Sequence, residues 1–309
     1  MAFFNKNNIQ LYESNFSDSY DYLYSWNERF NRERYFFEKL FKKYKTETIL
    51  DCGSGNGFHV NLFLSFKGIK RVAGIEVSSL MIKKAMKNLN KADHEKVRFY
   101  KGDLTDVAKI LKKADKFDMI TCMYCISTAL KGDAVITRVL KDLKKHLNKG
   151  GVLLIDDVNF DRIIEKELTS EVVTMDSDSY HFLQFRNFSI KVYKTLPFPI
   201  LFTNGGKSKK TFIHIASKYL FAWLKNKHRA IRIYHQIKSN LVLDYIFVLS
   251  GFIRWINVQT YRESLWILKK EKLRKYLLQS GFTSFRFYSG YKFAAFNTND
   301  FNMVVIAKV

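Results

Sequence analysis

The run Ile49-Leu50-Asp51-Cys52-Gly53-Ser54-Gly55-Asn56-Gly57 decides the fold class of this 309-residue chain. It places three glycines at alternate positions between a short apolar stretch and a helical pattern that passes through Leu62 and Phe63. Because glycine lacks a Cβ atom, the backbone can turn sharply there and approach a ligand within hydrogen-bonding distance. The spacing Asp-x-Gly-x-Gly-x-Gly differs from the pyrophosphate fingerprint Gly-x-Gly-x-x-Gly, so the run predicts a ligand-binding turn that does not serve a dinucleotide.

Short apolar runs continue downstream of this turn and alternate with amphipathic stretches. Residues 80–89 place Met81 and Ala85 on one face of a helix, with Ser78 and Ser79 as candidate caps. The runs expected to form strands are residues 48–52, 71–76, 97–101, 119–123 and 152–156. Strands that alternate with helices predict a Rossmann-like α/β fold with a doubly wound, mostly parallel sheet.

The two ends of the chain depart from this alternation. Residues 1–45 are rich in aromatic side chains at helical spacing, which predicts an N-terminal helical segment. Residues 182–195 alternate as antiparallel strands do. Residues 270–280 predict a helix, and strands are expected after it at residues 284–288 and 303–308. The parallel sheet should therefore carry an antiparallel addition.

A strongly basic stretch interrupts the second half of the chain. Residues 207–238 contain nine Lys or Arg and no Asp or Glu, around apolar side chains at helical spacing. Residues 241–256 are apolar but carry Asp244 and Arg254, which favours a buried or interfacial helix over a membrane span. We therefore expect a basic amphipathic helical insert over residues 201–256.

The composition bounds the partners and the compartment. A formal net charge of +23 indicates either an anionic partner or a codon bias that enriches lysine. The three cysteines, Cys52, Cys122 and Cys125, do not form the paired pattern of a secreted disulfide framework, and packing thiols are favoured over a zinc pair. The first residues turn polar before a signal-peptide core forms, so we expect a cytoplasmic protein.

Glu76 adds an acid to the glycine turn. It ends the run Val72-Ala73-Gly74-Ile75-Glu76, which is expected to be the second strand. An acid at that position accepts hydrogen bonds from the hydroxyls of a ribose in nucleotide-binding α/β folds. The turn and the acid together predict a site for a nucleoside.

Five motifs, in this order, resemble those of class I S-adenosylmethionine-dependent methyltransferases. They are Ile49 to Gly57, Gly74-Ile75-Glu76, Lys101-Gly102-Asp103-Leu104, Phe117-Asp118-Met119-Ile120 and Leu147-Asn148-Lys149-Gly150-Gly151. The resemblance covers about the first half of the chain and implies S-adenosylmethionine as the cofactor. It also implies a methyltransferase domain over residues 46–200 and 257–309, with residues 1–45 as a helical lid.

The same resemblance implies a role for each matching residue. Asp51 and the glycines would hold the methionyl part of the cofactor, Glu76 the ribose, and Asp103 with Leu104 the adenine. The cofactor-binding residues so implied are Asp51, Gly53, Ser54, Gly55, Gly57, Glu76, Asp103, Leu104 and Met123. Asp103 can instead cap the next helix, and Asp118 fits a structural role as well as a functional one.

Further segments resemble glycine and sarcosine N-methyltransferases and imply a small-molecule acceptor, with an amine nitrogen favoured. They are residues 155–163 and 290–308 together with Tyr20-Asp21-Tyr22, which in that group helps to cover the active site. Methyl transfer is an in-line displacement in which the protein aligns a lone pair and excludes water. The catalytic candidates are Tyr20, Tyr22 and His181 as proton acceptors and Arg186 as a ligand for a substrate carboxylate.

Two other acceptor classes stay open. In an RNA or cap methyltransferase, residues 207–238 would track phosphates. At an anionic membrane surface, the same insert would lie in the interface with Trp223 and Trp255 as anchors. The segment Met123-Tyr124-Cys125-Ile126-Ser127 follows the fourth expected strand and is not of the Asn-Pro-Pro-Tyr type used on planar nitrogens, which counts against nucleobases.

Overall fold

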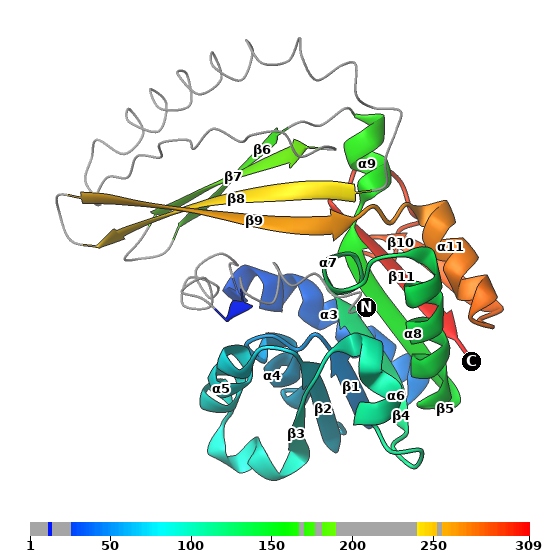
Figure 1. Ribbon diagram of the computed structural model, residues 1–309. Coiled ribbons are helices and arrows are strands. Elements are labelled where there is room, and N and C mark those ends of the chain that lie inside the picture. Colours follow the sequence, from blue (N-terminus) through cyan, green and yellow to red (C-terminus); the bar gives the residue numbers. More distant parts are fainter. Residues whose placement is uncertain (1–11, 14–25, 167–169, 177–180, 190–239, 252–254) are drawn as a thin grey trace. The chain divides into compact units, whose positions relative to one another are not determined.

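The computed structural model describes residues 12–13, 26–166, 170–176, 181–189, 240–251 and 255–309, and the side chains of 12–13, 29–166 and 265–309. Two compact units make up the chain (Figure 1). The larger is built on residues 25–167 and 266–309, and the smaller on residues 168–265. The described strands between residues 170 and 189 belong to the smaller unit, and the domain boundaries expected from the sequence stay a prediction.

A seven-stranded sheet forms the centre of the larger unit, in the order β10-β11-β5-β4-β1-β2-β3. Strands β1 to β5 run parallel to one another, and β11 pairs antiparallel with both β5 and β10. The strands are β1 Thr48–Cys52, β2 Arg71–Glu76, β3 Val97–Lys101, β4 Phe117–Met123, β5 Leu147–Val158, β10 Ser284–Ser289 and β11 Asn302–Lys308. The expected Rossmann-like, mostly parallel sheet is therefore confirmed.

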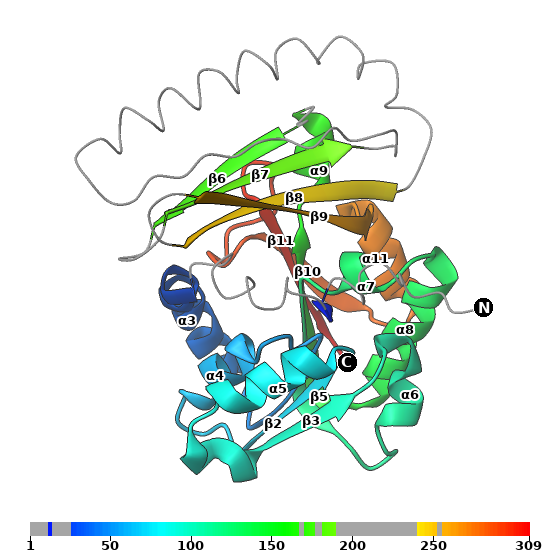
Figure 2. The ribbon, with the colours of Figure 1, turned by 60° about the vertical axis from the view of Figure 1, so that its left-hand side comes forward.

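Helices cover both faces of this sheet, with α3, α4 and α5 on one side and α6, α8 and α11 on the other (Figure 2). The side chain of Ser78 accepts a hydrogen bond from the Met81 amide and caps α5, as the sequence predicted. The helices are α3 Trp26–Tyr44, α4 Phe58–Leu64, α5 Ser79–Asn88, α6 Val107–Ile110, α7 Ile126–Ala129, α8 Asp133–Lys145, α9 Phe160–Glu165 and α11 Lys270–Gln279, with 3-10 turns η1 Lys91–Lys96 and η2 Leu104–Asp106.

Helix α3 is part of the hydrophobic core of the larger unit. The side chains of Phe36 and Phe37 are fully buried, and the Phe37 ring meets the Phe63 ring of α4 edge to face at 4.9 Å between centroids. Burial of one such side chain contributes about 1.5–3 kcal/mol. Residues 26–44 thus share one hydrophobic core with the sheet and helix α4. A separate lid can therefore lie only before residue 26.

The smaller unit contains a four-stranded sheet in the order β6-β7-β8-β9. Its strands are β6 Ser170–Asp176, β7 His181–Ser189, β8 Asn240–Gly251 and β9 Trp255–Trp266. Strand β7 pairs antiparallel with both β6 and β8, which confirms the antiparallel character expected from residue 182 onward. The basic stretch of residues 207–238 lies outside the described residues.

The helix expected over residues 241–256 is wrong, because the described part of that stretch lies in β8 and β9. The hydrophobicity of a continuous apolar run has no periodicity, so it cannot distinguish a buried helix from a buried strand. Here the β-branched and aromatic residues of Leu241 to Val248 favour a strand, and β7 supplies its hydrogen-bonding partner. The expected helical insert is thus replaced by strand at its carboxyl end.

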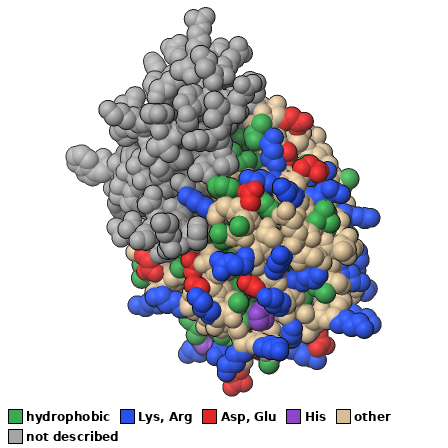
Figure 3. All heavy atoms as spheres, turned by 45° about the vertical axis from the view of Figure 1, so that its right-hand side comes forward, with side chains coloured by type: hydrophobic (Ala, Val, Ile, Leu, Met, Phe, Trp, Pro, Cys, Tyr) green, Lys and Arg blue, Asp and Glu red, His purple; other side chains and the backbone are tan. Residues whose placement is uncertain are grey.

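Positive charge is spread over the described surface of the larger unit. Figure 3 shows Lys and Arg side chains across the whole of one described face, with few Asp or Glu among them. Several of these cations pair locally with acids one helical turn away, as Lys109 does with Asp106 at 2.7 Å. No helix among the residues that the structure describes is long and apolar enough to cross a membrane.

Candidate active site

The glycine turn between β1 and α4 depends on backbone conformations that only glycine adopts readily. Gly53, Gly55 and Gly57 have φ angles of +69°, +52° and +80°. A Cβ atom on Gly53 would lie 2.8 Å from the Cβ of Cys125, and one on Gly57 would lie 2.9 Å from that of Ala85. These glycines are therefore fixed both by their backbone angles and by close neighbours.

Glu76 links the glycine turn to the start of helix α5. Its Oε2 accepts a hydrogen bond from the Gly55 amide and its Oε1 accepts one from the Ser78 amide, each at 2.9 Å. Burial raises the pKa of Glu76, although these amide bonds oppose the shift. Each carboxylate oxygen keeps a second lone pair. The side chain is thus held at the end of β2 and can still accept hydrogen bonds from two ligand hydroxyls.

Asp51 carries a buried carboxylate oxygen that the described residues leave unpaired. Its Oδ1 accepts a hydrogen bond from the Thr121 hydroxyl at 2.7 Å, whereas Oδ2 has no partner among the described residues, and neither has the buried hydroxyl of Ser54. Burial raises the pKa of Asp51. A buried acceptor without a donor is costly, so such an atom indicates a ligand that brings the donor. An ammonium group beside the glycine turn would fit this oxygen.

The other residues expected to hold the cofactor lie at the ends of β3 and β4. Asp103 accepts a hydrogen bond from the Thr105 amide at 2.7 Å and so caps the 3-10 turn η2. Leu104 and Met123 are both buried. Capping and ligand binding use different oxygens of one carboxylate, so the cap leaves the second oxygen of Asp103 as a candidate for adenine.

Asp118 lies at the opposite edge of the sheet from the glycine turn. It accepts hydrogen bonds from the amides of Glu47 and Thr48 and from the amide nitrogen of the Asn148 side chain, at 3.0, 2.9 and 2.7 Å. These bonds tie the starts of β1, β4 and β5 together. Of the two roles that the sequence left open for Asp118, this geometry supports the structural one.

The three cysteines are buried and carry free thiols. Cys52 and Cys122 are register partners on β1 and β4. Across the described ranges, no group of three or more His, Cys, Asp or Glu side chains is arranged to hold a metal ion. The cysteines therefore pack the strand ends beneath the glycine turn.

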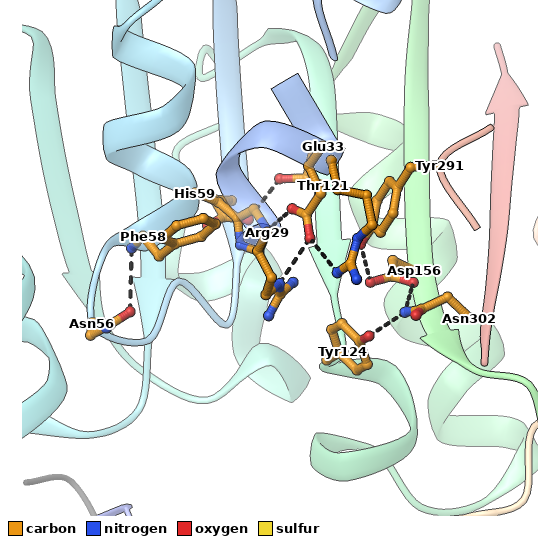
Figure 4. A network of polar contacts seen from close by, with 12 residues as sticks. Arg29, Glu33, Asn56, Phe58, His59, Thr121, Tyr124, Asp156, Tyr291 and Asn302 are labelled. Carbon is orange, nitrogen blue, oxygen red and sulfur yellow. Dashed lines mark hydrogen bonds and ion pairs between the residues drawn. The ribbon is translucent and has the colours of Figure 1, made fainter. Parts of the chain in front are cut away.

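Sequence reasoning missed a second set of polar residues at the same edge of the sheet. We call the side chains of Arg29, Glu33, His59, Tyr124, Asp156, Tyr291 and Asn302 the buried polar network (Figure 4). They come from α3, α4, the segment after β4, β5, the β10–β11 connection and β11. The strand order reverses between β1 and β4, and open α/β sheets bind ligands at such a reversal. The network therefore occupies the β4 and β5 side of the site, opposite Glu76.

Glu33 is the centre of one half of this network. Its Oε1 accepts a hydrogen bond from Arg29 Nε at 2.8 Å, and its Oε2 lies 2.9 Å from His59 Nε2. Burial opposes ionisation of Glu33, but Arg29 and His59 outweigh it and lower the pKa of that carboxyl to about 2. The guanidinium of Arg29 also lies 5.1 Å from the centre of the Tyr124 ring. This half therefore holds a buried ion pair against an aromatic ring.

Asp156 is the centre of the other half. Its Oδ2 accepts a hydrogen bond from the Tyr291 hydroxyl at 2.5 Å, and its Oδ1 accepts one from Asn302 Nδ2 at 2.7 Å. The same Asn302 nitrogen also donates to the Tyr124 hydroxyl. Burial raises the pKa of Asp156 to about 7, although the bonds from Tyr291 and Asn302 oppose the shift. In Figure 4 these side chains point toward Asp156 from β11 and from the connection before it.

None of the acceptor-binding candidates named from the sequence is among the described side chains. Tyr20 and Tyr22 lie outside the described residues. His181 and Arg186 are in β7 of the smaller unit, where Arg186 is the register partner of Tyr245 on β8. Their contact with an acceptor stays a prediction. The sequence contained a pointer to some of the missed residues. Ile155-Asp156-Asp157 and Tyr291 lie in the segments that resemble glycine and sarcosine N-methyltransferases.

Comparison with known proteins identifies the family. A family model described as a methyltransferase domain matches residues 43–211. A glycine/sarcosine N-methyltransferase from Aphanothece halophytica is 28% identical over 160 residues, which are 52% of this chain and 58% of that protein. The chain thus spans little more than half the length of this relative.

Solved structures share the fold over nearly the whole chain. An S-adenosylmethionine-dependent methyltransferase from Clostridium acetobutylicum superposes with a TM-score of 0.64 at 14% identity, over 94% of this chain and 98% of that one. CalS10, an amino pentose methyltransferase from Micromonospora echinaspora with bound S-adenosylmethionine, superposes with a TM-score of 0.59 at 13% identity, over 96% and 97%. At these identities the likeness concerns the fold.

Proposed function

Because the chain belongs to the class I S-adenosylmethionine-dependent methyltransferases, we propose that it transfers a methyl group from S-adenosylmethionine to a small amine. The observation that carries the donor half of this proposal is the buried Asp51 Oδ2 without a partner, next to three glycines of positive φ and the fixed carboxylate of Glu76. Such a set fits a nucleoside that bears an amino-acid tail.

Each residue of the glycine side has a distinct part in this proposal. Asp51 would accept a hydrogen bond from the ammonium of the methionyl group, and Glu76 would accept bonds from the ribose hydroxyls. Asp103, Leu104 and Met123 would enclose the adenine and the sulfonium end. When bound, the cofactor supplies a methyl carbon activated by a positively charged sulfur. The protein then has to align the acceptor lone pair with that carbon and exclude water.

The amine is supported by the relatives and by the carboxyl groups and aromatic rings of the buried polar network. The relative from Aphanothece halophytica is named for glycine and sarcosine, and CalS10 is named for an amino sugar. Within the network, Glu33 is paired with Arg29 and His59, with Arg32 3.4 Å away. Asp156 instead bonds to Tyr291 and Asn302, near the ring of Tyr124. Carboxylates and aromatic faces favour a cationic or partly cationic amine over a phosphate.

The test is a transfer assay with methyl-labelled S-adenosylmethionine. The full chain is incubated with glycine, with sarcosine, and with small-molecule, RNA, protein and lipid fractions of a cell extract. We expect label in glycine, sarcosine or another amine of the small-molecule fraction. Label in RNA alone would replace the proposal with the nucleic-acid function, and label in lipid alone with a membrane-surface function. An Asp51→Asn variant should lose transfer in every fraction, which separates enzymatic from chemical methylation.

A further inference from the structure

Tyr124 has a backbone conformation that nothing on the cofactor side requires. Its φ is 56°, in the left-handed region that bulky residues rarely adopt. Such a conformation persists where the surroundings hold it, and it is frequent at functional sites. Here the Tyr124 amide donates to the carbonyl of Asp156 at 2.7 Å, and the Tyr124 carbonyl accepts from the Thr128 hydroxyl at 3.0 Å. The fold therefore fixes where this side chain points.

The strand ends place Tyr124 beside the glycine turn. Met123 is the register partner of Asp156 at the end of β4 and β5, and Tyr124 follows directly. The next residue, Cys125, is the one whose Cβ a side chain on Gly53 would meet at 2.8 Å. One position of the chain therefore separates Tyr124 from the residue that touches the cofactor turn.

Hydrogen-bond directions show what the Tyr124 hydroxyl has left to offer. Asn302 Nδ2 carries two hydrogens, and it donates one to Asp156 Oδ1 and one to the Tyr124 hydroxyl. An ionised Asp156 can only accept, so it forces the NH₂ group of Asn302 to face both partners. The Tyr124 oxygen therefore keeps one lone pair for another partner. Asp156 fixes the direction of that lone pair indirectly, through Asn302.

We propose that the Tyr124 hydroxyl accepts an N–H of the acceptor amine and so turns the amine lone pair toward the methyl carbon. In the same proposal Asp156 is a positioning residue that acts through Asn302 and is itself held by the Tyr291 hydroxyl. This inference rests on the function proposed above. The amine lone pair forms the new N–C bond, the S–C bond breaks with its electrons going to sulfur, and the methylated ammonium releases its proton to solvent.

The ionisation of Asp156 gives this arrangement a pH dependence. The groups that face Asp156 are Tyr291 and Asn302 by direct hydrogen bonds, Tyr124 across Asn302, and Glu33 and Arg29 from α3. A protonated Asp156 no longer demands the NH₂ group of Asn302, so Tyr124 loses its fixed donor. Productive binding of the amine should therefore increase as pH rises through about 7, where Asp156 ionises.

The first test measures amine binding without turnover. Sarcosine and glycine are titrated by calorimetry into the complex with S-adenosylhomocysteine, for the wild type, Tyr124→Phe and Tyr276→Phe. Tyr276 is the control because its hydroxyl bonds to Asp133 on the far side of the sheet. Tyr124→Phe should weaken amine binding by about tenfold, the effect of one lost hydrogen bond, with the affinity for S-adenosylhomocysteine unchanged. Equal amine affinity in all three proteins overturns the inference and leaves the proposed function standing.

The second test asks whether the ionisation of Asp156 controls amine methylation. Removal of the Tyr291 hydroxyl takes a donor from the Asp156 carboxylate and should raise its pKa further. The acid limb of kcat/KM for amine methylation should then move to higher pH in Tyr291→Phe and stay in place in Tyr276→Phe. An acid limb that is identical in all three proteins reports the amine alone and rejects Asp156 as a positioning residue. A wild type that methylates no amine rejects both the proposed function and this inference.

Discussion

At the scale of single residues, the donor side depends on two carboxylates with different partners. Glu76 is held by two backbone amides, whereas Asp51 keeps one oxygen without a partner among the described residues. The two amides hold the Glu76 carboxylate in position before a ligand binds. The unpaired Asp51 oxygen needs a hydrogen-bond donor, and a ligand can supply it. Removing the ligand, or neutralising the carboxylate, should therefore have a different effect at Glu76 than at Asp51.

Replacing Glu76 with Ala should weaken the binding of S-adenosylhomocysteine by about 1–3 kcal/mol, because the charge-assisted hydrogen bonds proposed between this carboxylate and the ribose would be lost. Isothermal calorimetry measures this directly. Glu47→Ala is the matched control, since Glu47 forms an exposed ion pair with Lys70 at 2.7 Å and lies at the other edge of the sheet. Equal losses in the two variants would show that Glu76 contributes only to stability.

Gly57→Ala should destabilise the fold more than Gly150→Ala. Both glycines have a φ of +80°, so both variants carry the same backbone strain. Only the new Cβ on residue 57 meets a neighbour, at 2.9 Å from Ala85, whereas Gly150 has nothing within 4 Å. Strain costs about 1–3 kcal/mol, and crowding adds a comparable amount. Urea denaturation compares the two; equal free energies of unfolding would mean that α5 moves to make room.

At the scale of elements, helix α3 is joined to α4 by a polar contact as well as by aromatic packing. The Arg29–Glu33 pair is one helical turn long, and Glu33 reaches His59 on α4 at 2.9 Å. The side chain of Glu33 is fully buried. Loss of one partner of a buried pair leaves the other charge uncompensated, which is far more costly than loss of a surface pair.

Glu33→Gln should lower the free energy of unfolding by about 3–5 kcal/mol at neutral pH. Because the folded pKa of Glu33 is about 2, below its usual 4.5, this stabilisation is present above about pH 4.5 and is lost as pH falls toward 2. The difference between wild type and variant should therefore shrink on acidification. Asp106→Asn, which breaks the exposed pair with Lys109, should change the free energy by less than about 1 kcal/mol at any pH. Chemical denaturation across this pH range measures both, and a constant difference for Glu33→Gln would contradict the assignment.

Elements with a distinctive local sequence pattern could be predicted from the sequence. The strand-turn-helix around Gly55, the acid at Glu76 and the cap at Ser78 are local, so periodicity and turn chemistry predicted them. The stretch from 241 to 256 was misassigned because an apolar run without period leaves the choice to its partner strand. Pairing with β7 is a tertiary contact, and a short stretch of sequence gives no information about it.

The sequence did not identify the buried polar network as a unit for the same physical reason, although residues 155–163 and 290–308 carried a family resemblance. Glu33, Asp156 and Asn302 look like ordinary surface residues of a helix and two strand ends in a linear pattern. They become buried because α3 folds across α4 and because β11 inserts next to β5. Contacts between residues more than a hundred positions apart, such as Tyr291 with Asp156, leave no spacing that a motif can record.

At the scale of the whole molecule, the N-terminal part divides into two segments with different importance for folding. Residues 26–44 supply core side chains, among them Phe36, Phe37 and Leu40. Of the residues before them, the structure describes Tyr12 and Glu13, which accept hydrogen bonds from the Ser78 hydroxyl and the Ser79 amide at the start of α5. A truncation at residue 45 would therefore remove part of the core together with the proposed lid.

Deletion of residues 1–25 should leave a cooperative thermal transition and measurable binding of S-adenosylhomocysteine, while amine methylation falls. Deletion of residues 1–45 should abolish the cooperative transition, because α4 and the sheet lose the aromatic surface that covers them. Differential scanning calorimetry and a transfer assay on both truncations distinguish the outcomes. A folded and active product of the longer deletion would show that α3 is dispensable.

The residues assigned to the two halves of the site come from different parts of the chain. Everything assigned to the methyl donor lies in one continuous cassette from Asp51 to Met123, inside the matched residues 43–211. Arg29, Glu33, Tyr291 and Asn302 come from outside that range. Tyr124 and Asp156, to which the acceptor is assigned above, lie inside the matched residues, so the family match covers part of the acceptor side as well. A graft of α3 and the β10–β11 hairpin from one relative onto another should therefore transplant acceptor preference only if Tyr124 and Asp156 are exchanged with them.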